Sequence, residues 1–111
     1  MKTYSIHITQ TAQRDVSNAV SYIDTVLKNP IAADALLDEF ECRIQELSTF
    51  PEKYQLSNDP LLASWGIRFL IIKNHLAIYL VDEKSETVFV VRFLYGKSNW
   101  ISVLKGGFSI S

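Results

Sequence analysis

Apolar and polar residues alternate at the start of the chain. Over residues 3–9 the apolar members of the alternation are Tyr4, Ile6 and Ile8. A period of two is typical of a strand that is buried on one face and exposed on the other. The pattern therefore predicts a β-strand over residues 3–9.

Helical spacing follows in two stripes, whose members recur every three or four positions. The first stripe consists of Ala12, Val16, Ala19, Ile23 and Leu27, and the second of Ala33, Leu37, Phe40, Ile44 and Leu47. Thr9 or Thr11 suits the N-cap of the first helix, while Asn29 and Pro30 suit the N-cap and first position of the second. So short a break predicts an antiparallel helix hairpin.

Apolar runs rich in β-branched residues predict three more strands, over residues 66–73, 76–81 and 87–95. We expect the first turn at Asn74-His75 and the second over residues 82–86. Residues 51–65 show little periodicity and are predicted to form a loop. A short helix over residues 98–105 would end at Gly106, and residues 106–111 are predicted to be a loose tail.

These elements predict one α+β domain over residues 1–111 with the order β-α-α-β-β-β. Helices that are grouped together and followed by strands predict a helix hairpin packed on a mainly antiparallel four-stranded sheet. A length of 111 residues suits a single domain.

Composition excludes several classes of protein. Hydrophobic residues make up 48% of the chain and the formal net charge is −1, which excludes a disordered chain and argues against a strongly basic nucleic-acid-binding domain. The single cysteine, Cys42, excludes a disulfide scaffold. No apolar run approaches the 20 or so residues of a membrane span, and no leader is visible, so we expect a location in a reducing cytoplasm.

The near-neutral total conceals an uneven distribution of charge. Residues 1–65 hold five basic and nine acidic residues, a net charge of −4, whereas residues 66–111 hold six basic and three acidic ones, a net charge of +3. Any nucleic acid would therefore meet the sheet half of the molecule rather than the helix half.

Five local motifs resemble, in the same order, those of the RelE/ParE superfamily of toxins. They are residues 29–33 (NPIAA), 44–51 (IQELSTFP), 66–68 (GIR), 74–79 (NHLAIY) and 91–100 (VRFLYGKSNW). The resemblance covers about residues 3–104, and the long hairpin with its NPIAA turn favours the ParE-like branch. It implies the RelE/ParE fold and the bacterial cytoplasm.

The resemblance also implies a function and partners. These proteins are the toxins of bacterial type II toxin–antitoxin modules, each held inactive by a cognate antitoxin. RelE-like members cut mRNA on the ribosome, and ParE-like members poison DNA gyrase. A toxin–antitoxin complex of this kind is expected to bind operator DNA through the antitoxin. A degenerate domain that only binds its antitoxin is a third reading.

RNA cleavage requires a base for the ribose 2′-hydroxyl, an acid for the leaving oxygen and positive charge at phosphorus. Within apolar strands, Arg68 and Arg92 could clamp phosphate. Tyr95 stands where relatives often have histidine, and it could act as a base only if neighbouring cations lower its pKa. The full set of candidates is Arg68, Arg92, Tyr95 and Lys97 for catalysis, and Lys73 and Trp100 for RNA binding.

Structural roles compete with these assignments. Arg68 could equally pair with an acidic residue of the loop or helices, and Trp100 could anchor the C-terminal turn on the sheet. Tyr79 is predicted to be a core aromatic, His7 an exposed residue and His75 a turn residue.

No Cys/His spacing predicts a metal site, and no glycine loop predicts a cofactor. We therefore expect neither, and a nuclease of this kind would be metal-independent. Because the sheet half is basic, the sequence favours the mRNA endonuclease over the gyrase poison.

Overall fold

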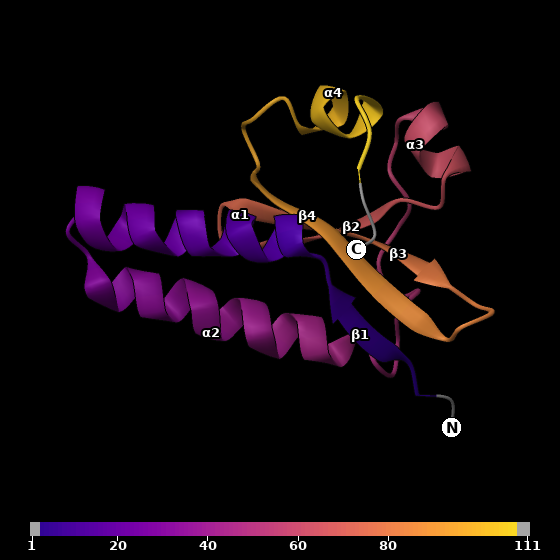
Figure 1. Cartoon of the computed structure of the whole chain (residues 1–111), viewed down its shortest axis with the longest axis horizontal. Helices are drawn as coiled ribbons and strands as arrows, with labels where there is room; N and C mark the ends of the chain where they lie inside the picture. Colours follow the sequence, from indigo (N-terminus) through magenta and orange to yellow (C-terminus); the bar gives the residue numbers. More distant parts are fainter. Residues whose placement is uncertain (1–2, 109–111) are drawn as a thin grey trace.

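A four-stranded sheet carries a helix hairpin on one face and two short helices on the other (Figure 1). The computed structural model describes residues 3–108. Its elements are β1 (Ser5–Ile8), α1 (Gln10–Ser21), the π-helical segment η1 (Tyr22–Val26), α2 (Pro30–Glu46), α3 (Pro60–Ser64), β2 (Arg68–Ile72), β3 (His75–Asp82), β4 (Thr87–Tyr95) and α4 (Trp100–Lys105). The predicted α+β fold is confirmed.

The strands are arranged in the order β1-β4-β3-β2. The pairs β2–β3 and β3–β4 are antiparallel, whereas β1 lies parallel to β4 at one edge. The register of β3 and β4 shifts by one residue, because Ile78 pairs with Arg92 and Tyr79 with Val90. Val91 is left without a partner and forms a β-bulge.

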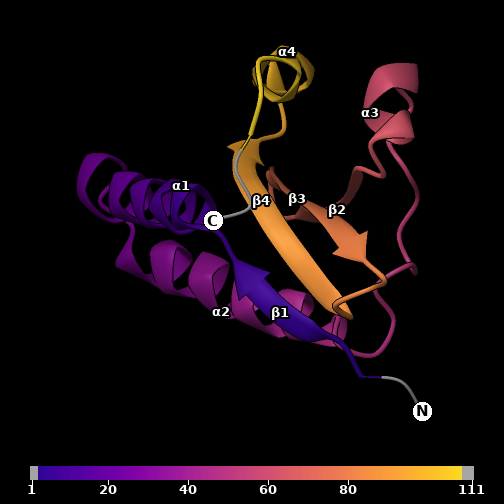
Figure 2. The same ribbon diagram turned by 45° about the vertical axis from the view of Figure 1, so that its right-hand side comes forward.

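Two hydrophobic cores lie on opposite faces of the sheet. The larger core joins α1 and α2 to the sheet through residues such as Val16, Phe40 and Val90. The smaller core lies under α3 and α4 and contains Leu62, Ile67, Ile78, Val91 and Leu104. Figure 2 shows α3 and α4 well away from the hairpin, on the other side of the strands. Both faces of the sheet are therefore covered over part of their length.

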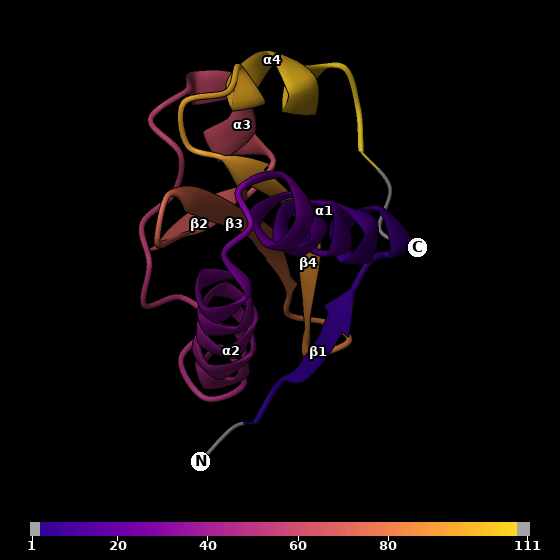
Figure 3. The same cartoon turned by 90° about the vertical axis from the view of Figure 1, so that its left-hand side faces the viewer.

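The hairpin begins and turns where its capping residues predict. Thr9 accepts a hydrogen bond from the Ala12 amide at 3.2 Å, and Asn29 accepts one from the Ala32 amide at 3.1 Å. The end-on view of Figure 3 shows α1 and α2 side by side against the sheet. The predicted caps and the antiparallel hairpin are confirmed.

Two members of the predicted apolar stripes, Leu37 and Leu27, are not buried in the core. In α2 it is Leu36 that is buried, and the predicted Leu37 is only half-buried. Leu27 is 56% exposed, because the first helix ends in a π turn in which the Leu27 amide donates to the Tyr22 carbonyl at 3.1 Å. A π turn inserts an extra residue and rotates the following side chains off the helical stripe.

Residues 60–64 were predicted as loop, and this was wrong. They form α3, in which the carboxylate of Asp59 accepts from the Leu61 and Leu62 amides and Pro60 takes the first helical position. The same cap-plus-proline arrangement begins α2 at Asn29-Pro30. A helix of five residues is too short to show a periodic stripe, so only its cap could have been recognised.

The C-terminal elements are close to those expected. The predicted short helix is α4, followed by Gly106 and by Gly107 with φ 111°. Of the predicted loose tail, residues 109–111 lie outside the described part, while the Phe108 ring lies 6.0 Å from that of Trp65. Among residues 3–108, no helix has the length and apolar character that a membrane crossing requires.

Replacing Asn29 by alanine should lower the free energy of unfolding by about 1 kcal/mol, because the Ala32 amide loses its capping acceptor. Chemical denaturation followed by circular dichroism measures the change. The control is Asn18→Ala, at an exposed position inside α1. Equal losses from both replacements would contradict a capping role for Asn29.

Candidate functional site

A hollow of about 890 Å³ lies between the helix hairpin and one end of the sheet. The hairpin lines it with Asp15, Tyr22 and Leu27, among others, and the sheet lines it with Lys73, His75 and Tyr95. Its walls are mainly apolar and aromatic, with a few polar groups, which is typical of ligand and partner sites. Two sequence-predicted residues, Lys73 and Tyr95, meet in this hollow.

His75 stands directly opposite Tyr95 in the register of β3 and β4. Its ring stacks on Phe93 with a centroid distance of 4.9 Å and an interplanar angle of 7°, and the Tyr95 ring meets it edge-on at 5.6 Å. Nδ1 is buried and has no hydrogen-bond partner among the described residues. Burial lowers the pKa of His75 below its usual value near 6.5, so the ring is neutral at pH 7.

The prediction that His75 is a turn residue was wrong. The turn consists of Lys73 and Asn74, with Lys73 at φ 57°, and His75 is the first residue of β3. Placing the turn one residue earlier would have shown from the sequence that His75 faces Tyr95. Sequence reasoning missed this residue because a one-residue change in the turn alters every cross-strand neighbour.

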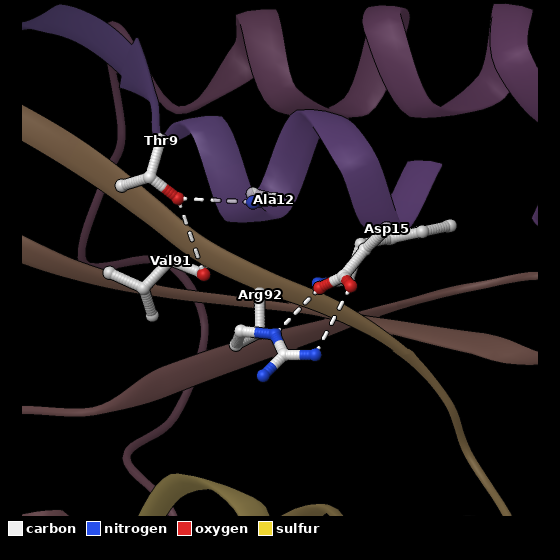
Figure 4. Close-up of polar contacts among 6 residues, drawn as sticks. Thr9, Ala12, Asp15, Val91 and Arg92 are labelled. Atoms are coloured by element: carbon white, nitrogen blue, oxygen red, sulfur yellow. Dashed lines mark hydrogen bonds and ion pairs between the residues drawn. The ribbon is translucent and has the colours of Figure 1, made fainter. Parts of the chain in front are cut away.

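Arg92 is held by an ion pair with α1 (Figure 4). Its Nε lies 2.7 Å from Oδ2 of Asp15 and its Nη2 lies 3.1 Å from Oδ1. The Phe93 amide also donates to Oδ2 of Asp15, at 3.1 Å. The side chains of Arg92 and Asp15 are only 22% and 13% exposed, respectively. This bidentate contact occupies the Nε–Nη2 edge, one of the two edges by which a guanidinium can clamp a phosphate.

The junction of β1 and α1 also binds β4, next to the residues that Asp15 contacts. The Thr9 amide donates to the Val90 carbonyl at 3.0 Å, and the Thr9 hydroxyl donates to the Val91 carbonyl at 3.3 Å (Figure 4). Asp15 is therefore part of a continuous set of contacts between the start of α1 and the bulge of β4. Nothing in the local sequence distinguishes Asp15 from other polar residues of its helix, so only the packing reveals it.

Arg68 lies at the other end of the sheet. Its Nη1 donates to the Tyr54 carbonyl at 2.6 Å, which ties β2 to the loop after α2. The acidic partner considered for Arg68 is absent from the described residues, and a backbone carbonyl takes its place. Arg68 pairs with Tyr79, four residues along β3 from the partner of Tyr95, which corresponds to about 13 Å.

The remaining candidates are also apart from one another. Lys97 is exposed in the turn after β4. Trp100 begins α4 and lies 5.5 Å from the Phe69 ring, within the smaller core. The structure thus brings Lys73 and Tyr95 together and leaves Arg68, Arg92, Lys97 and Trp100 in other surroundings.

Two structural assignments are confirmed. Tyr79 is completely buried, and its hydroxyl donates to the Pro51 carbonyl at 2.7 Å. His7 is exposed on β1, with its ring edge-on to Phe89. Within residues 3–108, no three His, Cys, Asp or Glu side chains gather in a way that could hold a metal ion.

A family model described as the ParE toxin of the type II toxin–antitoxin system parDE matches residues 6–100. The chain belongs to this ParE toxin family. The expected RelE/ParE membership is therefore confirmed, as is its role as a toxin of a type II module. No curated protein matches the sequence of this ParE-family toxin.

Solved structures share the fold of this toxin. A chromosomal ParDE toxin–antitoxin system from P. aeruginosa aligns with a TM-score of 0.67 and 18% identity, over 84% of this chain and 96% of the other. The RelBE2 toxin–antitoxin complex from Mycobacterium tuberculosis aligns with a TM-score of 0.58 and 20% identity, over 84% and 98%. Both belong to toxin–antitoxin systems. The matched family model itself describes the toxin of such a system, which supports an antitoxin partner for this chain.

Replacing Asp15 by alanine should lower the free energy of unfolding by about 3 kcal/mol, because Arg92 keeps a largely buried charge without its partner. The double variant Asp15→Ala/Arg92→Ala should lose clearly less than the sum of the two single variants. Urea denaturation of all four proteins measures the coupling. Additive losses would show that the ion pair contributes nothing beyond its separate side chains.

Proposed function

We propose that this toxin inhibits growth by binding a protein target, DNA gyrase, and that it does not cut RNA. The observation that carries the proposal is the state of Arg92. A guanidinium that two carboxylate oxygens already hold at 2.7 and 3.1 Å has its charge balanced within the protein. It is a poor source of the positive charge that a phosphorane requires.

The wider charge distribution supports the same proposal. Arg68 is bound to the Tyr54 carbonyl, and Lys105 forms an ion pair with Asp59 at 2.8 Å. Three of the six basic residues in 66–111, Arg68, Arg92 and Lys105, are therefore held in internal contacts. The ParE-like branch that the sequence resembles acts on gyrase. A toxin that acts in this way needs a surface for docking and no acid–base pair.

A cognate antitoxin is the second partner, and we expect it to cover the hairpin tip and the adjoining hollow. The tip exposes four large apolar side chains, Tyr22 at 54%, Val26 at 60%, Leu27 at 56% and Ile31 at 82%. Tyr22 and Leu27 also line the hollow. Exposed apolar surface of this kind marks interaction sites, and an antitoxin bound there would also connect the toxin to operator DNA.

Ribosome-dependent mRNA cleavage is the other candidate, and one observation favours it. The neutral imidazole of His75 lies beside Tyr95, and Lys73 lines the same hollow. A neutral histidine is a suitable base for a 2′-hydroxyl, and a lysine can stabilise charge on phosphate. This arrangement supplies the histidine that β4 itself lacks.

The two functions predict opposite results with purified components. We expect the toxin to inhibit supercoiling by DNA gyrase and to leave mRNA on purified ribosomes intact. Tyr95→Phe should retain the inhibition, because gyrase binding needs no proton transfer by that phenol. Ribosomal mRNA cleavage combined with normal supercoiling in excess toxin would overturn the proposal in favour of the nuclease. Normal growth of cells that express the toxin alone would indicate the degenerate, antitoxin-binding domain.

Replacing Ile31 by aspartate should weaken binding of the antitoxin encoded beside the toxin gene by about tenfold or more. This is the effect expected when an exposed apolar side chain that the antitoxin would bury on binding is lost. Titration calorimetry measures the affinity. Ile71→Asp is the matched control, since Ile71 is 60% exposed but lies on β2, away from the hairpin tip. An equal effect of both replacements would exclude the tip as the antitoxin surface.

A further inference from the structure

The ring of His75 occupies the boundary between the hollow and the core of the sheet. One face lies flat on Phe93, and the ring also lines the hollow. Nδ1 is sealed on the core side with no partner among the described residues. The imidazolium form would carry an N–H there that has no acceptor, in addition to a charge in an apolar environment.

No group around the hollow is placed to stabilise that charge. Asp15 of α1 already accepts from Arg92 and from the Phe93 amide. α2 contributes only uncharged side chains to the lining, and Lys73, the one Lys or Arg among the described residues that line the hollow, would repel a charged imidazole. The charged and titratable groups that face His75 across the hollow are Asp15 from α1, Tyr22 from η1, Lys73 from the β2–β3 turn and Tyr95 from β4.

We propose that His75 is an acid-sensitive latch that closes the sheet side of this hollow. In the neutral form the ring stays stacked on Phe93 and holds the start of β3 in place. When the ring takes up a proton, it leaves the Phe93 face for solvent, and the apolar floor of the hollow becomes accessible. The proposal concerns the conformation of the free toxin, so it holds whether the target is gyrase or RNA.

The movement is confined to the end of the sheet. His75 follows the turn residues Lys73 and Asn74, and the Asn74 carbonyl accepts from the Gly96 amide at 2.8 Å. On the other side of Phe93, Asp15 holds the backbone amide of that residue. The turn on one side and the Phe93 backbone on the other are thus fixed, which leaves the His75 side chain as the part that can change position.

The direction of the pH effect follows from burial. Because the pKa of His75 is lower in the folded protein than the usual 6.5, the unfolded chain binds a proton more readily. The contribution of His75 to the free energy of unfolding is fully present above about pH 6.5. It is lost as the pH falls through the lower pKa that His75 has in the folded protein. Acid therefore weakens this end of the sheet before it affects groups with ordinary pKa values near 4.

The chain offers a matched control, because its two histidines differ in burial. His7 is exposed on β1, far from the hollow, while His75 is half-buried. His75→Phe keeps a flat ring that can stack on Phe93 and removes both the proton site and the unpartnered Nδ1. His7→Phe removes a histidine without changing the hollow.

The test compares the wild-type toxin with the two variants between pH 7.5 and 5.5. We expect the wild type and His7→Phe to lose about 3–6 °C more in Tm over this range than His75→Phe, because only they keep the imidazole of His75. The NMR signals of the Phe93 and Tyr95 rings should shift together with the titration of His75 and remain constant in His75→Phe.

Three results would overturn the latch. In the wild type, which requires no substitution, a His75 titration midpoint at or above 6.5 would show that the buried ring is not disfavoured as a cation. Titration of His75 without any shift of the Phe93 and Tyr95 signals would show that the ring stays in place when charged. A pH profile of His75→Phe identical to that of the wild type would likewise remove His75 as the cause.

Discussion

The carboxylate of Asp15 joins the two halves of this protein. β1 has four residues and ends at Ile8, so the part of β4 beyond the bulge has no strand on that side. α1 takes the place of the missing strand, and Asp15 accepts from the Phe93 amide and twice from Arg92. A strand edge that would otherwise hold unpaired backbone donors is satisfied by a helix side chain. The hairpin is thereby fixed in position over the sheet.

The same contact decides the electrostatic character of the sheet. Arg92 interrupts an apolar strand, which by itself suggests a functional cation, yet its charge is balanced from α1. The bulge at Val91 makes this possible, because the register shift places Val91 in the smaller core and sets Arg92 beside the helix. The net charge of the sheet half is thus a poor measure of the positive charge available to a partner. This is why the proposed target is a protein although the count of residues favoured RNA.

Local patterns predicted most of the fold. Alternation, helical stripes, caps and tight turns depend on neighbours within a few residues, and these give β1, the hairpin with its Thr9 and Asn29 caps, and the three-strand meander. The failures also have local causes. α3 is too short to show a stripe, the π turn rotated Leu27 out of the core, and a turn placed one residue late hid His75 from its partner Tyr95. Each of these failures arises from a shift of one residue or from a helix too short to show a pattern.

The sequence alone determined the order of the elements and the apolar faces that form the core, because both depend on short-range spacing. Its local motifs also resemble those of the toxin family whose model it matches. Only the tertiary structure decided which polar side chains meet. Arg92 and Asp15 are 77 positions apart, and His75 faces Tyr95 on the neighbouring strand. Whether an arginine is available to a ligand or already paired depends on such distant neighbours, since charge is compensated through space and not along the chain.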